Sequence, residues 1–334
     1  MKNKKIIKTF FISILVAIIL IFIFSKNPIY SIRLFFIAPF TKFRYFANII
    51  ENMIPLIFTG VGMCFILSCG EFNLASEGCF HIGGFTAACI SVLTTNICIH
   101  NTVVAVIVSG IIASIIIIIP AVIKMKSGGS ELVSSIMLNF IILHLTNYLL
   151  MKYIRDPMTG YGSYELNLEL KTLISNTRIH SGLIIASIVI IFAYILLYKT
   201  KFGLEIRIIG NNKKYAEISG VNISFVLLTS QWIGGFLAGM GGAIELLSPI
   251  YIRYSWTNLL GFGWDAIIIA ILAKNNPLKV PIYAFMLAYI RTGSYIMERL
   301  SDVSSDIALI FQAIIIIVFI SDIFMKKNKG VKSC

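Results

Sequence analysis

Long apolar runs separated by short polar connections follow one another along almost the whole chain. A helix that crosses a bilayer needs about 20 predominantly apolar residues, and runs of roughly that length recur from one end of the sequence to the other. The pattern therefore predicts an all-α membrane protein with about ten transmembrane helices. We expect spans at residues 9–25, 52–69, 77–95, 102–123, 132–153, 182–198, 223–247 and 305–324, and two shorter apolar segments at 264–273 and 280–297.

The composition supports this class. Hydrophobic residues make up 58% of the 334 residues and charged residues only 13%, whereas about 25% of a soluble domain is charged. The mean hydropathy is +0.90. These values exclude a soluble enzyme, a nucleic-acid-binding domain, a disordered tail and a secreted disulfide scaffold. The net charge of +13 does not indicate nucleic acid, because the basic residues mostly flank apolar runs, where they set topology and meet lipid headgroups.

The basic residues also predict the orientation of the chain. With the N-terminus in the cytoplasm, most of the 28 Lys and Arg residues fall on the cytoplasmic side, as the positive-inside rule requires. Ten crossings then place both termini in the cytoplasm. Residues 1–25 resemble a signal peptide, but no small-residue cleavage site follows them. We expect them to be retained as a first span and N-terminal anchor.

The chain lacks common sequence motifs of enzymes that hydrolyse ATP, use zinc or use a nucleophilic serine. It has no GxxxxGK[ST] loop for ATP phosphates, no HExxH zinc motif and no GxSxG nucleophile elbow. The four histidines are scattered, and none of the six cysteines forms a CxxC pair. We therefore expect no metal site and no catalytic residues.

A polar motif, GEFNLASEG at residues 70–78, separates two of the predicted spans. Polar groups at membrane depth are costly and often functional, and the two terminal glycines permit an unwound turn that offers its backbone to a solute. We expect a broken or re-entrant segment that lines a translocation path. An ordinary turn with Glu77 near a helix N-terminus is the alternative. The path candidates in this motif are Phe72, Asn73, Ser76 and Glu77.

A second Gly-rich break is predicted at residues 261–265. Matched broken helices in two halves of a chain are a known pattern among transporters. Trp264 and Asp265 of this break, with Asn139 of the span 132–153, complete the path candidates. Asp265 is equally suited to cap the apolar run that follows it, and Asn139 to hydrogen-bond a neighbouring helix.

The span 223–247 contains Gly235 and Gly239, which form a GxxxG pair. Such a pair lets two helices approach each other closely. We therefore assign these glycines to helix packing.

The largest polar stretch on the predicted cytoplasmic side is residues 199–222, KTKFGLEIRIIGNNKKYAEISGVN. We expect a short amphipathic helix from Asn212 to Ser219 within it. Gly220 would close this helix as the left-handed residue that commonly follows a helix end.

The motif at 70–78, extended by Gly83, resembles the pattern G-x-F-N-I-G-x-E-G-Q of permease subunits of ABC importers. The family is the branched-chain amino acid, ribose and simple-sugar type, and its nucleoside branch is the most similar. The sequence departs from the pattern at Leu74, Ala75 and Cys79.

Four further motifs follow in the family's order. Residues 131–139 resemble E-x-[IV]-x-[ST]-x-M-x-N, and residues 202–220 resemble the family's cytoplasmic F-G-x-x-x-R segment. The stretches GFLAGMGGAIELL and GFGWDAIIIAILAKNNPLKV continue the match. The resemblance covers about residues 45–320.

The resemblance implies that the chain forms half of the membrane pore of an ATP-driven importer. It implies one permease domain over residues 1–334, with a core at 45–325 and a cytoplasmic coupling loop at 199–222. Arg207 and Lys213 are expected to pair with acidic groups of the ATPase. The residues that match the coupling motif are Gly203, Arg207, Gly210, Asn212, Ala216 and Gly220.

The resemblance also implies partners and a location. A separate ATPase subunit would use ATP and Mg²⁺, so this chain itself would hold no cofactor. An extracytoplasmic solute-binding lipoprotein would deliver the solute, and a second permease chain, related or identical, would complete the pore. The chain would lie in the bilayer of a bacterial cytoplasmic membrane as a multi-pass protein.

The expected solute is a purine nucleoside, because the order E-F-N-x-x-x-E-G resembles the nucleoside branch. A simple sugar of the ribose type is the alternative. A proton-coupled carrier that uses Glu77 and Asp265 as proton carriers is a third hypothesis.

Overall fold

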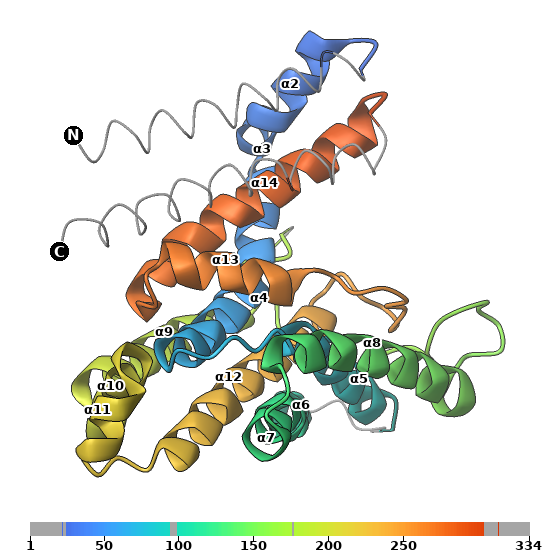
Figure 1. The fold of residues 1–334 in the computed structure, drawn as a ribbon. Coiled ribbons are helices and arrows are strands. Elements are labelled where there is room, and N and C mark those ends of the chain that lie inside the picture. Colours follow the sequence, from blue (N-terminus) through green and yellow to red (C-terminus); the bar gives the residue numbers. More distant parts are fainter. Residues whose placement is uncertain (1–21, 23–24, 94–98, 176, 304–312, 314–334) are drawn as a thin grey trace, which may run out of the picture. The chain divides into compact units, whose positions relative to one another are not determined.

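The computed structural model describes residues 22, 25–93, 99–175, 177–303 and 313, and within them it contains helices and irregular segments but no strand (Figure 1). Two isolated bridges join Arg155 to Ser163 and Thr172 to His180. The α-helices are α2 (Pro28–Phe36), α3 (Ala38–Thr41), α4 (Phe43–Ser68), α5 (Ser76–Leu93), α6 (Ile99–Ile116), α7 (Ile118–Ser127), α8 (Glu131–Leu149), α9 (Gly182–Lys199), α10 (Lys201–Asn211), α11 (Lys213–Ile218), α12 (Ile223–Leu246), α13 (Phe262–Leu272) and α14 (Val280–Leu300). A π-helical turn, η1 (Leu150–Ile154), extends α8, and a 3₁₀ turn, η2 (Pro277–Lys279), precedes α14.

The chain divides into two compact units, which we describe separately. One is formed by Met1–Asn52 with Phe285–Cys334, and the other by Met53–Ala284. In the first unit, Tyr289 joins α14 to the N-terminal helices, because its hydroxyl donates to the carbonyl of Phe36 at 2.9 Å and its ring stacks on Phe40.

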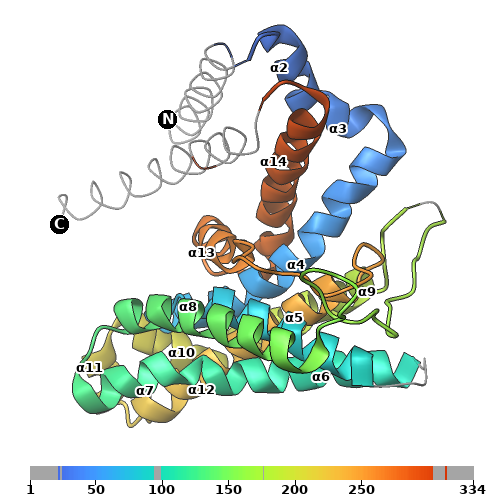
Figure 2. The ribbon, with the colours of Figure 1, turned by 90° about the vertical axis from the view of Figure 1, so that its right-hand side faces the viewer.

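Helix α12 is the centre of the second unit, where it packs against α5 and α6 (Figure 2). The contact depends on residues without side chains. A Cβ atom at Gly239 would lie 2.4 Å from the Cβ of Ala113, and one at Gly242 would lie 1.9 Å from the carbonyl oxygen of Phe80. The glycines of α12 thus allow the backbones to approach closely, as small residues do in membrane helices.

Five described helical stretches are long and apolar enough to cross a membrane: Phe43–Ser68, Thr102–Ser127, Glu131–Ile154, Gly182–Lys199 and Ile223–Leu246. Four of them match predicted spans within a few residues, and Phe43–Ser68 contains most of the predicted span 52–69 but begins nine residues earlier. The described residues thus confirm the all-helical class with apolar helices long enough to cross a membrane. Helix α13 is a shorter apolar helix of 11 residues. The predicted spans 9–25 and 305–324 fall almost wholly outside the described residues. The count of ten and the cytoplasmic position of both termini therefore stay predictions.

The helices are interrupted at both Gly-rich motifs. Helix α4 ends at Ser68, the backbone turns at Gly70 with φ +79°, and α5 begins at Ser76. Residues 250–260 are irregular, and α13 begins after Gly261, whose φ is +82°. Glycine adopts this left-handed backbone without the strain that a Cβ atom adds.

The segment 199–222 contains two helices where the sequence analysis expected one. The expected helix is α11, with Asn212 as its N-cap and Gly220 at φ +73° beyond its end. The unexpected helix is α10, whose N-cap Thr200 accepts a hydrogen bond from the N–H of Gly203 at 3.2 Å. Ile206 and Ile209, three residues apart, give α10 a buried apolar face.

The connection 155–181 is irregular and lies against the segment 248–261. Arg253 contacts Asp156 and donates to Glu165 at 2.8 Å. The N–H of Leu166 donates to the carbonyl of Ile252 at 2.9 Å. These bonds fix a long loop that has no regular structure of its own.

Candidate functional site around the helix break at residues 69–75

Asn73 is fully buried in the break and bonds to two other segments. Its side-chain amide donates to the carbonyl of Ile117 at 2.8 Å and to the Gln231 side-chain oxygen at 2.7 Å. Its own side-chain oxygen accepts the N–H of Ala75 at 2.9 Å. The side chain therefore fastens the unwound backbone to the α6–α7 junction and to α12.

Helix α8 holds the break from another side. The Asn139 amide donates to the carbonyl of Leu74 at 2.9 Å, and its oxygen accepts the N–H of Gly78 at 2.8 Å. Ser135 Oγ accepts the N–H of Leu74 at 3.1 Å. The hydrogen bonds that an unwound segment loses are thus replaced by side chains, as burial requires. In this structure Asn139 of α8 hydrogen-bonds to Leu74 and to Gly78 of α5. Hydrogen bonding to a neighbouring helix is the alternative that the sequence left open.

The two Gly-rich breaks meet at Glu77. Its carboxylate accepts the N–H of Gly261 at 2.7 Å and that of Gly263 at 2.5 Å, so it lies at the N-terminus of α13. Both the free N–H groups and the helix dipole favour a negative charge there. There is no room for a side chain at Gly263, where a Cβ would lie 2.3 Å from the backbone nitrogen of Glu77.

The remaining path candidates differ in exposure. Phe72 is 47% exposed and Trp264 is half-buried. Ser76 is buried, and its hydroxyl has no hydrogen-bond partner among the described residues. Asp265 is buried in the first turn of α13. The structure thus brings Asn73, Ser76, Glu77, Asn139 and Asp265 together around one buried break and leaves the two aromatic side chains at its surface.

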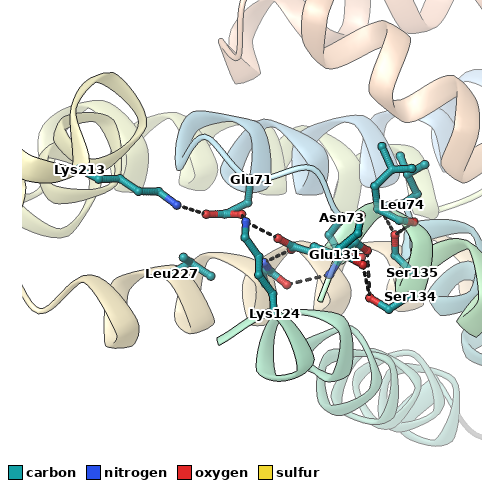
Figure 3. A network of polar contacts seen from close by, with 12 residues as sticks. Glu71, Asn73, Leu74, Lys124, Glu131, Ser134, Ser135, Lys213 and Leu227 are labelled. Carbon is teal, nitrogen blue, oxygen red and sulfur yellow. Dashed lines mark hydrogen bonds and ion pairs between the residues drawn. The ribbon is translucent and has the colours of Figure 1, made fainter. Parts of the chain in front are cut away.

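A charged network lies at the start of the break (Figure 3). Glu71 pairs with Lys124 of α7 and with Lys213 of α11, the latter at 2.5 Å. Lys124 also pairs with Glu131 of α8 at 3.0 Å. The side chain of Gln231 donates to Glu131 and accepts from Asn73. Four helices are joined to the break through these contacts.

The burial of this network is uneven. The side chain of Glu71 is 0% exposed, whereas those of Lys124 and Lys213 are 38% and 48% exposed. Each ion pair therefore joins a partly exposed lysine side chain to a buried carboxylate. Burial opposes ionisation of Glu71, but hydrogen bonds with Glu131, Lys124 and Lys213 outweigh it. The pKa of the Glu71 carboxyl consequently lies below its ordinary value.

Sequence reasoning missed this network. It placed Glu71 in the motif without a role and expected Lys213 to pair with a separate ATPase. In the structure Lys213 pairs within the chain, although it is 142 positions from Glu71. The only signals in the sequence were the charges in the polar connections between apolar runs. Such a charge does not reveal which residue it pairs with.

The coupling-motif residues allow close backbone packing in the segment 199–222 and set the ends of its helices. A Cβ at Gly203 would lie 2.3 Å from the carbonyls of α9, and one at Gly210 would lie 2.0 Å from the carbonyl of Ser68. Ala216 is buried, and the caps Asn212 and Gly220 set the ends of α11 as described above.

Arg207 is also engaged within the chain. Its guanidinium lies 5.0 Å from the ring centre of Tyr198, a cation–π distance, and its Nε donates to the carbonyl of Gly203 at 3.3 Å. The large apolar side chains that α11 presents outward are Tyr215, 60% exposed, and Ile218, 86% exposed.

A cavity of about 380 Å³ lies between α4, α9 and α12, away from the break. Its lining is apolar and aromatic, which does not suit a hydroxyl-rich solute. The lining of the cavity includes Phe65, Phe192, Leu196, Trp232, Leu237 and Met240.

Within the described ranges, no group of three or more His, Cys, Asp or Glu side chains is placed to hold a metal ion.

Known proteins resemble the chain over most of its length. It is 26% identical over 283 residues to the guanosine ABC transporter permease protein NupP of Bacillus subtilis, covering 83% of this chain and 81% of that protein. It is 25% identical over 335 residues to the nucleoside ABC transporter permease protein NupB of Lactococcus lactis subsp. cremoris, covering 96% and 92%. It is 24% identical over 322 residues to the glucose ABC transporter permease protein TsgB13 of Haloferax volcanii, covering 91% and 83%.

The fold has a solved counterpart as well. It resembles a chain of PsaBC from Streptococcus pneumoniae in complex with Fab, with a TM-score of 0.50, 13% identity and coverage of 87% of this chain and 93% of that one.

The branched-chain amino acid transport system permease component family matches residues 45–320. The proteins that it resembles in sequence are transport subunits rather than enzymes. The chain belongs to this family of membrane permease components.

Proposed function

We propose that this chain is the permease subunit of an ATP-driven importer that carries a purine nucleoside into a bacterial cell. The observation that carries the proposal is the similarity to permeases named for guanosine and for nucleosides over 83% and 96% of the chain. A simple sugar is the second candidate, because the glucose permease of Haloferax volcanii is similar over 91% of the chain.

The chain works as part of an assembly under this proposal. A separate ATPase binds ATP and Mg²⁺ at the cytoplasmic face, and this chain holds no cofactor. A solute-binding lipoprotein delivers the nucleoside, and a second permease chain, identical or related, completes the pore. All ten spans of the single domain lie in the cytoplasmic membrane of the cell, with both termini inside.

The segment 199–222 is the coupling element in this proposal. Helix α11 offers Tyr215 and Ile218, three residues apart and therefore on one helical face, to an apolar groove of the ATPase. Their exposures of 60% and 86% support this assignment, since large apolar side chains that reach into water often mark a binding surface. The buried coupling-motif residues shape α10 and α11 so that this face is presented.

The solute passes the break at residues 69–75 under this proposal. Phe72 and Trp264 offer aromatic faces for a base, and the hydroxyl of Ser76 is without a partner in the part of the chain that the structure describes. Asn73, Asn139 and Glu77 act indirectly, because their polar atoms already hold the backbone in place. Asp265 supports the contact between the break and the solute from its position in the first turn of α13.

Uptake of radiolabelled adenosine and ribose tests the function. Cells would carry this chain with the ATPase and binding protein encoded beside it, and each assay would be repeated with a catalytically dead ATPase. We expect adenosine uptake that the dead ATPase abolishes. Ribose uptake alone would keep the importer and overturn the solute. Uptake that ignores the dead ATPase and collapses with a protonophore would favour the proton-coupled carrier.

A further inference from the structure

Among the described residues, Glu71 is the only residue of the helix break that forms an ion pair with α11. One carboxylate oxygen accepts Lys213 of α11 at 2.5 Å, and the other accepts Lys124 of α7. Both oxygens are thus committed to cations from different helices. The carboxylate is fully buried, so water reaches these contacts only past the lysine side chains, which are 38% and 48% exposed, and less freely than at a fully exposed ion pair.

The contacts continue from Lys124 and return to the break. Lys124 donates to Glu131 at 3.0 Å, Glu131 accepts from Gln231, and Gln231 accepts from Asn73 at 2.7 Å. Glu71 and Asn73 are two residues apart in the unwound segment. The series of polar contacts therefore begins at Glu71 and ends at Asn73, both in the break.

Helix α11 depends on such anchors. It has six residues, and an isolated helix of that length is not stable in water. The Asn212 side chain caps its first turn, and α11 is attached to its surroundings through the buried Ala216 and the ion pair of Lys213 with Glu71. The neighbouring Lys214 is exposed and forms no ion pair with a described residue.

We propose that Glu71 is a positioning residue that transmits movement of α11 to the helix break at residues 69–75 through its ion pairs with Lys213 and Lys124. The proposal rests on the proposed function, in which α11 receives the movement from the ATPase. The buried Glu71 carboxylate is paired at both oxygens and so has few alternative arrangements. Displacement of α11 therefore displaces Glu71, and with it the backbone that Asn73 holds on α12.

The first test needs no partner protein. Hydrogen exchange of residues 213–220 would be measured in the purified permease in lipid nanodiscs, for the wild type, Lys213→Met and the matched control Lys214→Met. We expect Lys213→Met to speed exchange of α11 by about tenfold and Lys214→Met to leave it unchanged, because only Lys213 is paired. Equal exchange in all three proteins would overturn the anchoring.

The second test measures transmission in the assembled transporter. ATP hydrolysis by the complex would be measured with and without solute-loaded binding protein. We expect Lys213→Met and Glu71→Gln to reduce the stimulation by about tenfold, within the usual range of coupling between sites, while the ATPase stays bound in a pull-down. The double variant should be no worse than Glu71→Gln alone, since Glu71→Gln already removes the ion pair with Lys213.

Different results reject different parts. A wild-type complex without ATP-driven uptake would reject the proposed function. A wild-type complex that transports normally, with Lys213→Met and Glu71→Gln equally stimulated, would reject only the role of Glu71. A loss of stimulation equal in Lys214→Met would likewise reject it, because the effect would then follow charge and not the ion pair.

Discussion

The carboxylate of Glu77 accepts the backbone N–H of Gly263 at 2.5 Å, although the two residues are 186 positions apart in the chain. This bond joins the break before α5 to the break before α13. The same carboxylate also accepts the N–H of Gly261 at 2.7 Å. Its charge is therefore committed to the end of a helix, which disfavours a role as a mobile proton carrier.

Replacing Glu77 by Gln should destabilise the permease. The amide keeps one acceptor oxygen, but it loses the charge and presents a donor to a backbone N–H. We expect a loss of about 2 kcal/mol, since hydrogen bonds to charged groups contribute about 1.5–3 kcal/mol. Thermal unfolding of the purified protein in detergent measures it. The control Glu169→Gln changes an exposed carboxylate and should have no effect; equal stability of both variants would contradict the structural role of Glu77.

Replacing Gly242 by Ala should loosen the central helix packing. The new methyl group would lie 1.9 Å from the carbonyl oxygen of Phe80, which belongs to a backbone and has little freedom to move. Overpacking of this kind costs about 1–3 kcal/mol.

The matched control for Gly242 is Gly160→Ala, because nothing lies within 4 Å of a Cβ at Gly160. Melting temperatures in the same detergent compare the two variants. A Gly242→Ala protein as stable as Gly160→Ala would mean that α5 and α12 are not so closely packed.

How much the sequence predicted depends on the range of the interaction. Apolar runs predicted four of the five described spans within a few residues, because a span needs only local hydrophobicity. The fifth helix begins at Phe43, nine residues before the predicted start at 52. Gly220 likewise predicted the end of α11. The pairing of Glu71 with Lys213 was out of reach, since it depends on how α4, α10 and α11 pack, and no local pattern encodes that.

The candidate site divides in the same way. An interruption of the helices within residues 70–78 was correctly predicted, because glycines and polar residues interrupt an apolar pattern. That this interruption lines a path stays a prediction. The bonds of Asn73 and Asn139 were not predictable, since an amide suits a solute and a backbone equally well. Only the packing of α8 and α12 against the break shows that both amides are occupied.

Acid should destabilise the loop before α9 through His180. The ring is fully buried, and its Nδ1 accepts the N–H of Gly182 at 3.2 Å. Burial lowers its pKa from 6.5 to about 4. As the pH falls below 6.5, the unfolded chain takes up a proton that the folded chain refuses, so the free energy of unfolding falls between pH 6.5 and 4. At pH 5 the loss is about 2 kcal/mol.

Thermal unfolding at pH 7.5 and pH 5 checks this sign. His180→Asn offers an oxygen near the position of Nδ1 but does not titrate in this range. We expect the variant to lose less stability than the wild type on acidification. If both proteins lose the same amount, another group causes the pH dependence.

The outward face of α11 should decide how tightly the ATPase binds. Tyr215 and Ile218 are the exposed large apolar side chains of this helix, and truncating a central interface residue costs about 2 kcal/mol. We expect Tyr215→Ala and Ile218→Ala each to weaken ATPase binding roughly 30-fold, as measured by titration of the ATPase onto the permease in nanodiscs. Ile252→Ala, which truncates a side chain 70% exposed in the irregular segment before α13, is the control. Binding that none of the three variants changes would remove α11 from the contact, whereas weaker binding in all three would show a general loss of folding.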